Sequence, residues 1–183
     1  VRTLHADGAR VAIHYRGAAD AARALAEELN DTRDASAATF QADLLDTPAL
    51  PALAEAVLDW AGGLDILVNN ASSFYPTPIG EITESAWDDL IGSNLKGPLF
   101  LSQAYLPALR EARGVIINLV DIHGQRPLKQ HHVYSPAKAG LAMLTRALAK
   151  DLGPEVRVNG VSPGAILWPS DGMSTEVKQA ILD

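Results

Sequence analysis

The alternation of short apolar runs with longer helix-like segments constrains the fold of this 183-residue chain more than any other feature. Runs of strand character lie at 9–15, 36–42, 64–70, 114–120 and 156–162. Segments of helical character lie between them at 17–30, 47–62, 83–112 and 133–152. Continuous apolar strands that alternate with helices are typical of a parallel sheet covered on both faces. The pattern therefore predicts an α/β fold, a Rossmann-like doubly wound parallel sheet with helices on both faces, in a single domain over residues 1–183.

The composition excludes several classes of protein. The chain has no cysteine, which removes disulfide frameworks and thiolate metal sites, and its histidines do not have metal-ligand spacing. The formal net charge of −7 argues against a nucleic-acid partner. No apolar run approaches the ~20 residues that a membrane span needs, and the first residues contain no apolar signal segment. We therefore expect a cytoplasmic protein with no metal, nucleic-acid or membrane partner.

Polar or small residues follow each predicted strand, and in doubly wound sheets ligands bind beyond the carboxyl ends of the strands. One such residue alone means little, because loops are polar in general. Together they predict a ligand-binding rim made of His14, Tyr15, Arg16, Asp43, Asn69, Asn70, Ala71, Ser72, Asp121, Ser162, Pro163 and Gly164.

Tyr134 and Lys138 are four residues apart on the helix predicted over 133–152, so their side chains share one face. A phenol has a pKa of about 10, and an ammonium one helical turn away favours the phenolate. We therefore expect Lys138 to lower the pKa of Tyr134 and to make it usable in proton transfer. The alternative is an exposed helix face that happens to carry both residues.

Four motifs give the chain a resemblance to the short-chain dehydrogenase/reductase family. They are "NNAS" (69–72), "SNLKGPL" (93–99), "YSPAK" (134–138) and "VNGVSPG" (158–164), in the order that the family has them. By this resemblance Tyr134 delivers a proton beside the atom that receives hydride, and Lys138 holds the ribose of a nicotinamide cofactor. Asn94 matches the asparagine that bends its helix and holds a water behind the lysine.

The resemblance also implies how the cofactor is held and which one it is. No acid follows the strand 9–15 until Asp20, whereas Arg16 can pair with a 2′-phosphate, so NADPH is expected rather than NADH. A solvated arginine in a turn is the alternative. The expected cofactor contacts are His14, Tyr15, Arg16, Asp43, Leu44, Asn70, Ala71, Ser72, Tyr134, Lys138, Pro163 and Gly164, with Asp43 near the adenine amino group.

Asp121 departs from the family pattern, in which a serine usually binds the substrate carbonyl. A carboxylate only accepts hydrogen bonds, so it suits a heterocycle with N–H donors; a protonated Asp121 that donates is the alternative. The pteridine reductase subgroup has this substitution, and "NNASSFYPTP" (69–78) resembles its substrate loop. Ser72, Phe74, Asp121 and Tyr134 are then expected to bind a pterin or folate. Phe74 stacks on it, unless that side chain is a core residue.

The ends of the sequence depart from the family as well. No glycine-rich turn precedes 9–15, "VRTLHADGAR" reads as the end of a first helix, and the last residues stop within the substrate-loop helices. The sequence is therefore interpreted as fragmentary at both ends, a part of a longer protein. If it is instead the whole polypeptide, we expect the sheet to lack its central strand, to expose apolar faces and unpaired strand edges, and to fold and act poorly. Trp168 stands where the family has a mobile substrate loop, and His123 lies near Asp121.

The resemblance implies an oligomer and leaves two other functions open. In the family, the helices around 83–112 and 132–152 pack against a second subunit, which predicts a homotetramer. The alternatives to a pteridine reductase are a reductase of the same family acting on another carbonyl or heterocycle, and a non-catalytic NADP-binding protein. Asp121 with Phe74 argues against the first, and the intact set of Asn94, Tyr134 and Lys138 argues against the second.

Overall fold

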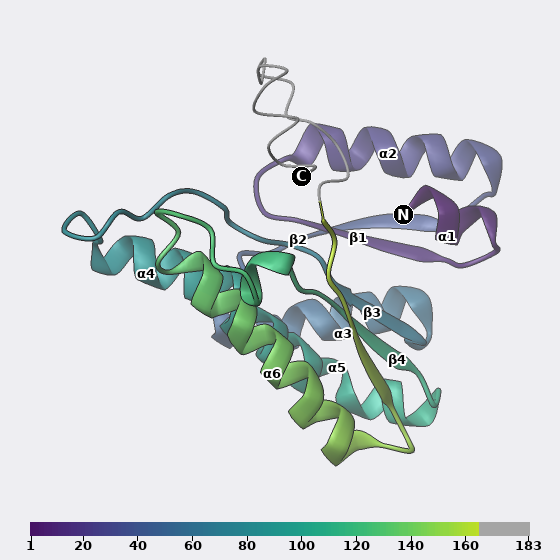
Figure 1. Ribbon diagram of the computed structural model, residues 1–183. Helices are drawn as coiled ribbons and strands as arrows, with labels where there is room; N and C mark the ends of the chain where they lie inside the picture. The colour runs from purple at the N-terminus through teal and green to yellow at the C-terminus, as the bar shows by residue number, and fades with distance from the viewer. Residues whose placement is uncertain (165–183) are drawn as a thin grey trace.

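The structure, a computed structural model, describes residues 1–164 (Figure 1). Its helices are α1 (Arg2–Ala6), α2 (Ala19–Thr32), α3 (Leu50–Ala61), α4 (Glu84–Ile91), α5 (Gly97–Glu111) and α6 (Tyr134–Leu152). Its strands are β1 (Val11–Tyr15), β2 (Ala37–Gln41), β3 (Ile66–Asn69), β4 (Val115–Leu119) and β5 (Arg157–Val161). Short 3-10 turns lie at η1 (Thr47–Ala49) and η3 (Ile122–Gly124), and a π-helical turn lies at η2 (Gly92–Lys96). The predicted order of strands and helices is confirmed.

Every strand pair is parallel, as predicted, and the strands form two sheets. β1 pairs with β2, with Ile13 opposite Thr39. β4 lies between β3 and β5, with Ile116 opposite Leu67 and Val158. Because parallel strands all point the same way, their carboxyl ends and the loops that follow gather at one edge of each sheet.

Helices cover the sheets on both sides. In Figure 1, α6 lies on the near side of β4 and β5, with α3 and α5 on the far side. The largest core cluster joins these helices to the strands through buried residues such as Leu50, Leu109, Ile116 and Val156. A second, smaller cluster, around Ile13 and Leu29, holds α2 on β1 and β2. Among residues 1–164 no helix combines the length and apolarity needed to cross a membrane.

The start of α4 and the end of α3 are each fixed by a capping residue in the sequence. Thr83 caps α4 by accepting a hydrogen bond from the Ala86 amide at 3.1 Å, which satisfies a donor of the first turn. α3 ends at Gly62, which has φ +79°, a left-handed conformation that glycine adopts without strain. In this way the chain leaves α3 and enters β3.

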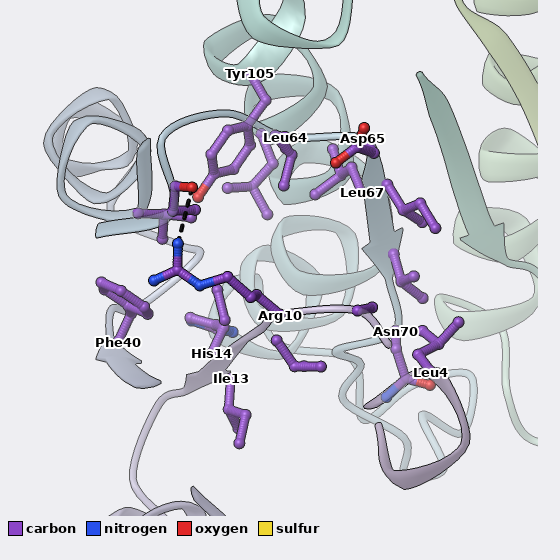
Figure 2. Close-up of a pocket in the computed structure, with 18 of the residues that line it drawn as sticks. Leu4, Arg10, Ile13, His14, Phe40, Leu64, Asp65, Leu67, Asn70 and Tyr105 are labelled. Atoms are coloured by element: carbon purple, nitrogen blue, oxygen red, sulfur yellow. Dashed lines mark hydrogen bonds between the residues drawn. The ribbon is translucent and has the colours of Figure 1, made fainter. Parts of the chain in front are cut away.

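An apolar cavity of about 760 Å³ separates the two sheets. β1 and β3 are its walls, with α1, α3 and α5 around them, and Leu4, Ile13, Leu67 and Tyr105 line it (Figure 2). Ile66 and Val68 of β3 are 41% and 42% exposed, unusually open for strand residues of this kind. Among the described residues β1 and β3 are each paired on one side only, so one edge of each of these strands faces the cavity.

Candidate active site

The Tyr134 hydroxyl and the Asp121 carboxylate form a direct pair. Tyr134, on the first turn of α6, donates to Asp121 Oδ2 at 2.5 Å, a length usual for a hydroxyl bonded to an anion. Asp121 Oδ1 accepts from the His123 amide at 2.8 Å. Both carboxylate oxygens therefore act as acceptors.

A close backbone approach brings this pair together. Asp121 follows β4 and begins η3, and Gly124 ends that turn against α6. A Cβ at Gly124 would lie 3.0 Å from the main-chain atoms of Lys138 and Ala139, so a side chain there would force η3 away from the helix. Glycine at this position thus allows the loop that carries Asp121 to reach Tyr134.

Lys138 lies one turn below Tyr134, as its spacing predicted. The residue is only 4% exposed, its Nζ donates to the Leu119 carbonyl at 2.8 Å, and Nζ lies 5.7 Å from the centre of the Tyr134 ring. Burial lowers the pKa of Lys138, while the charge of Asp121 acts in the opposite direction. An ammonium has three donors, so two remain for a ligand.

The predicted direction of the Tyr134 pKa is wrong for this structure. Burial raises the pKa of Tyr134, and the hydrogen bond and charge of Asp121 raise it further. The helical spacing gave the position of Lys138 correctly. It did not reveal that the phenol is buried or that a carboxylate 13 residues away in sequence accepts its hydrogen bond. The hydroxyl is therefore held protonated, as a proton donor requires.

Asn94 lies in the π-helical turn η2, where the helix predicted over 83–112 is interrupted. The expected bend is present, because a π turn inserts an extra residue between α4 and α5. The side chain is fully buried, and its Nδ2 donates to the carbonyls of Ser73 and Leu90, each at 2.9 Å. Its Oδ1 is buried with no partner among the described residues. That free acceptor is what a water behind the lysine would bind.

The loop after β3 is anchored at both ends and exposes Phe74 between them. At one end the Ser73 amide donates to Ser93 Oγ at 3.2 Å. At the other, Thr77 bonds to the main chain of Gln130 and Val133. Phe74 is 55% exposed, which excludes the core alternative.

The Phe74 ring packs against two other aromatic rings at the site. It meets the Tyr134 ring edge-on with centroids 4.8 Å apart. It also stacks on the His131 ring at 4.8 Å. A flat ligand above Tyr134 would therefore meet the Phe74 side chain.

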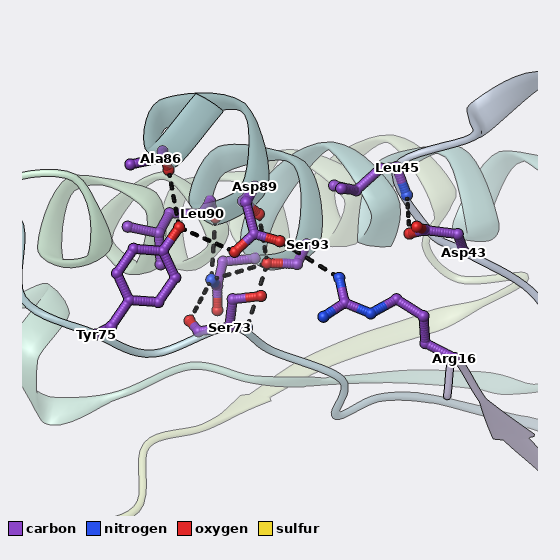
Figure 3. A network of polar contacts seen from close by, with 10 residues as sticks. Arg16, Asp43, Leu45, Ser73, Tyr75, Ala86, Asp89, Leu90 and Ser93 are labelled. Carbon is purple, nitrogen blue, oxygen red and sulfur yellow. Dashed lines mark hydrogen bonds and ion pairs between the residues drawn. The ribbon is translucent and has the colours of Figure 1, made fainter. Parts of the chain in front are cut away.

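Arg16 and Asp43 stand at the carboxyl ends of β1 and β2 (Figure 3). The Arg16 guanidinium bonds through Nη1 to Asp89 Oδ1 of α4 at 3.3 Å. Asp43 accepts from the Leu45 amide at 3.0 Å, which turns the chain after β2. His14 Nε2 lies 3.0 Å from the Ala42 carbonyl, so that ring is fixed between the two strands.

The remaining predicted residues lie along the same edge but differ in burial. Asn70, Ala71 and Ser72 are exposed after β3, and Pro163 and Gly164 follow β5. Leu44, by contrast, is buried in the main core cluster, so its side chain faces the interior. Tyr15 is half-buried and packs against the smaller cluster. Trp168 lies outside the described residues.

Two residues near the site, Asp89 and His131, carried no motif and were not predicted. Asp89 bonds to Arg16 and also accepts from the Tyr75 hydroxyl at 3.0 Å. His131 is buried beneath Phe74, with Nδ1 at 2.8 Å from the Lys129 carbonyl. His123, whose role was open, bonds through Nδ1 to the Arg126 carbonyl at 3.1 Å on the rim. Helical spacing from Asn94 could have placed Asp89 near the turn, but nothing marked its partners.

Comparisons with known proteins agree with these motifs. A family model described as short chain dehydrogenase matches residues 1–179. The chain is 38% identical over 207 aligned positions to "Pteridine reductase 1" of Leishmania tarentolae, covering 92% of this chain and 72% of the relative. It is 34% identical over 182 positions to the 3-oxoacyl-(acyl-carrier-protein) reductase FabG of Staphylococcus aureus, covering 98% and 74%. It is also 37% identical over 172 positions to L-xylulose reductase of Bos taurus, covering 92% and 66%.

Proposed function

Because the chain belongs to the short-chain dehydrogenase family, we propose that it is an NADPH-dependent pteridine reductase acting on dihydropterins or folates. Membership makes it an oxidoreductase of the kind that uses a nicotinamide nucleotide. The observation that carries the finer proposal is the Asp121 carboxylate bonded to the Tyr134 hydroxyl. The names of these three relatives give three different substrates at similar percentage identity. The support for a pterin is therefore the contact between Asp121 and Tyr134.

The acid at position 121 sets which substrates fit. A ketone presents only an acceptor oxygen, and an ionised carboxylate beside it is repulsive because it has no proton to donate. A pterin ring presents N–H and amino donors as well as a ring nitrogen to protonate. Asp121 accepts from those donors, while Tyr134, kept protonated by burial and by Asp121, donates its proton to the ring nitrogen. Lys138, 5.7 Å from the ring centre, stabilises the phenolate that remains.

The residues present fit a nicotinamide nucleotide with a 2′-phosphate. Lys138 has donors left for ribose hydroxyls after its bond to Leu119. Arg16 uses only Nη1 toward Asp89, so its Nε and Nη2 edge is left for a phosphate. When bound, the nucleotide supplies the hydride. Phe74, exposed and next to Tyr134, would cover the other face of the pterin.

A substrate panel on the full-length gene product tests this proposal. NADPH oxidation would be followed with dihydrobiopterin, dihydrofolate, a 3-oxoacyl thioester, L-xylulose and simple ketones. We expect turnover with the two pterins and none with the carbonyl substrates. Turnover of a carbonyl substrate without the pterins would discard the pteridine assignment, and no turnover of any of them would favour a non-catalytic NADP-binding protein.

Replacing Tyr134 with Phe separates proton donation from binding. The ring and its contact with Phe74 are kept, whereas the hydroxyl bonded to Asp121 Oδ2 is lost. We expect pterin turnover to fall by about 10²- to 10⁴-fold, the usual contribution of a positioned acid. NADPH affinity, measured by fluorescence titration, should be nearly unchanged. Substantial turnover in this variant would show that another group donates the proton.

The proposal includes the homotetramer. Its support here is that α5 and α6 carry exposed apolar side chains, Leu99 at 38% and Met143 at 59%. A second subunit covering them would remove this apolar surface from water. Sedimentation equilibrium of the full-length gene product is expected to give four times the mass of one chain, and a monomer would contradict the tetramer alone.

A further inference from the structure

One carboxylate, that of Asp89, bonds to residues from both halves of the site (Figure 3). Its Oδ1 accepts from Arg16 Nη1 at 3.3 Å, at the end of β1. Its Oδ2 accepts from the Tyr75 hydroxyl at 3.0 Å, in the loop after β3. Arg16 and Tyr75 are far apart in sequence, and Tyr75 is the neighbour of Phe74. A single side chain thus links the residue expected at the nucleotide phosphate to the loop expected at the substrate.

The helix that carries Asp89 is well fixed. α4 begins at the Thr83 cap and leads directly into the π-helical turn. The Asp89 main-chain carbonyl accepts from Ser93 Oγ at 2.7 Å, and that Oγ accepts from the Ser73 amide. The Asp89 side chain is 23% exposed, against 56% for Arg16. The carboxylate is therefore the more buried partner of this ion pair.

The two bonds leave both partners able to act on ligands. Arg16 keeps its Nε and Nη2 edge free, which is the geometry for a bidentate pair with phosphate. Tyr75 is held by its hydroxyl, and both burial and Asp89 raise its pKa, so the phenol stays a donor to the carboxylate. A phosphate bound to Arg16 would neutralise part of the guanidinium charge that Asp89 faces. It would therefore change the strength of the hydrogen bond between Asp89 and the Tyr75 hydroxyl.

We propose that Asp89 is a positioning residue that couples the 2′-phosphate of the nucleotide to the substrate loop, through Arg16 on one side and Tyr75 on the other. This inference rests on the proposed function, because it takes Arg16 as the phosphate residue and the loop as the pterin site. Coupling between two binding sites is reciprocal, so it has two readouts. Asp89 should affect the preference for NADPH over NADH, and the nucleotide should affect pterin affinity through Asp89.

Three variants of the full-length gene product separate these effects. Asp89→Asn keeps the size and removes the charge that orients Arg16. Tyr75→Phe keeps the ring and removes only the bond to Oδ2. Asp88→Asn is the matched control, since Asp88 is exposed on the same helix and its loss changes the net charge equally. For each, kcat and KM would be measured with NADPH and NADH, and dihydrobiopterin affinity would be measured on the NADP⁺ and NAD⁺ complexes.

The preference for NADPH should fall by about two- to fivefold in Asp89→Asn, the range for an exposed ion pair, through the KM for NADPH rather than kcat. Asp88→Asn should leave the preference at the wild-type value. In the wild type, dihydrobiopterin should bind the two nucleotide complexes with different affinities. That difference should vanish in Asp89→Asn and in Tyr75→Phe and persist in Asp88→Asn.

The possible failures are distinguishable. If the wild type reduces pterins with a preference for NADPH but Asp89→Asn behaves like Asp88→Asn, the inference is overturned and the proposed function stands. If the wild type binds pterin equally in both complexes, the coupling is overturned. If the wild type does not reduce pterins, the proposed function fails and the inference fails with it. Should Asp89→Asn not fold, an undiminished affinity difference in Tyr75→Phe would still overturn the coupling.

Discussion

Replacing Asp121 with Asn tests the electrostatic reasoning at the centre of the site. Asparagine has the same size and keeps an acceptor oxygen, but it removes the charge on the group that accepts the Tyr134 hydrogen bond at 2.5 Å. Hydrogen bonds to charged groups contribute about 1.5–3 kcal/mol, against about 1 kcal/mol for neutral ones. The variant therefore changes one interaction by an amount that an activity assay and a titration can both resolve.

The sign of the pH effect follows from the direction of the pKa. Asp121 and burial both raise the pKa of Tyr134, so the phenol is a proton donor below that pKa and loses this role as pH rises through it. In Asp121→Asn only burial remains, so Tyr134 ionises at lower pH than in the wild type. The lost interaction corresponds to about one to two pH units. Pterin turnover at neutral pH should fall about 10- to 100-fold, because the substrate N–H donors also lose a charged acceptor.

Ultraviolet difference spectra would measure this ionisation directly. Phenolate absorbance would be titrated in the wild type and in Asp121→Asn, each against the same protein carrying Tyr134→Phe, so that the other tyrosines cancel. A Tyr134 that ionises at the same or higher pH in Asp121→Asn would refute the assignment of Asp121 as the acceptor that keeps the phenol protonated.

Three further variants test separate parts of the structure. Phe74→Ala should raise the KM for dihydrobiopterin about two- to tenfold, the value of one aromatic stack, whereas Ile79→Ala, also exposed on that loop, should not; equal effects would remove Phe74 from the substrate site. Asn94→Ala should lower the free energy of unfolding, measured in urea, by about 2–4 kcal/mol, because it leaves the carbonyls of Ser73 and Leu90 without their buried donor. A change below about 1 kcal/mol would show that the π turn does not depend on the Asn94 side chain. Burial raises the pKa of Tyr105 to about 12, so its protonated form stabilises the fold fully below about pH 10 and this is lost as pH rises toward 12. The free energy of unfolding, measured in urea, should therefore fall between about pH 8 and pH 11 by about 1 kcal/mol less in Tyr105→Phe than in the wild type. An equal fall in both proteins would show that Tyr105 is not the group that titrates.

The strands and helices could be predicted because their signals are local. Each predicted strand is present and is one or two residues shorter at one or both ends. The apolar run in the sequence extends beyond the hydrogen-bonded part of the strand, so it overestimates the length. The long helix predicted over 83–112 is instead α4, a π turn and α5, although Asn94 was expected to bend it.

The site was predictable as a set of residues and not as a set of contacts. The carboxyl ends of parallel strands place Arg16, Ser72 and Asp121 on one rim without further information. Which side chains then bond depends on tertiary distances: Asp121 reaches Tyr134 because Gly124 lies against α6, and Asp89 reaches Arg16 from a helix with no motif. The error in the direction of the Tyr134 pKa has the same origin, because spacing on a helix says nothing about burial.

Asp121 and Asp89 act in the same way on different partners. Each is a carboxylate from a loop or helix end that fixes a donor needed by a ligand: the phenol of Tyr134 in one case, the guanidinium of Arg16 in the other. Both donors are thus oriented before any ligand arrives, which lowers the conformational cost of binding. At Tyr134 the substrate must compete with Asp121 for the hydroxyl donor, whereas Arg16 keeps its Nε and Nη2 edge free for a phosphate. A substrate with its own N–H groups can satisfy Asp121 in return, whereas a bare carbonyl cannot, and this asymmetry is the physical reason to expect a heterocycle at this site.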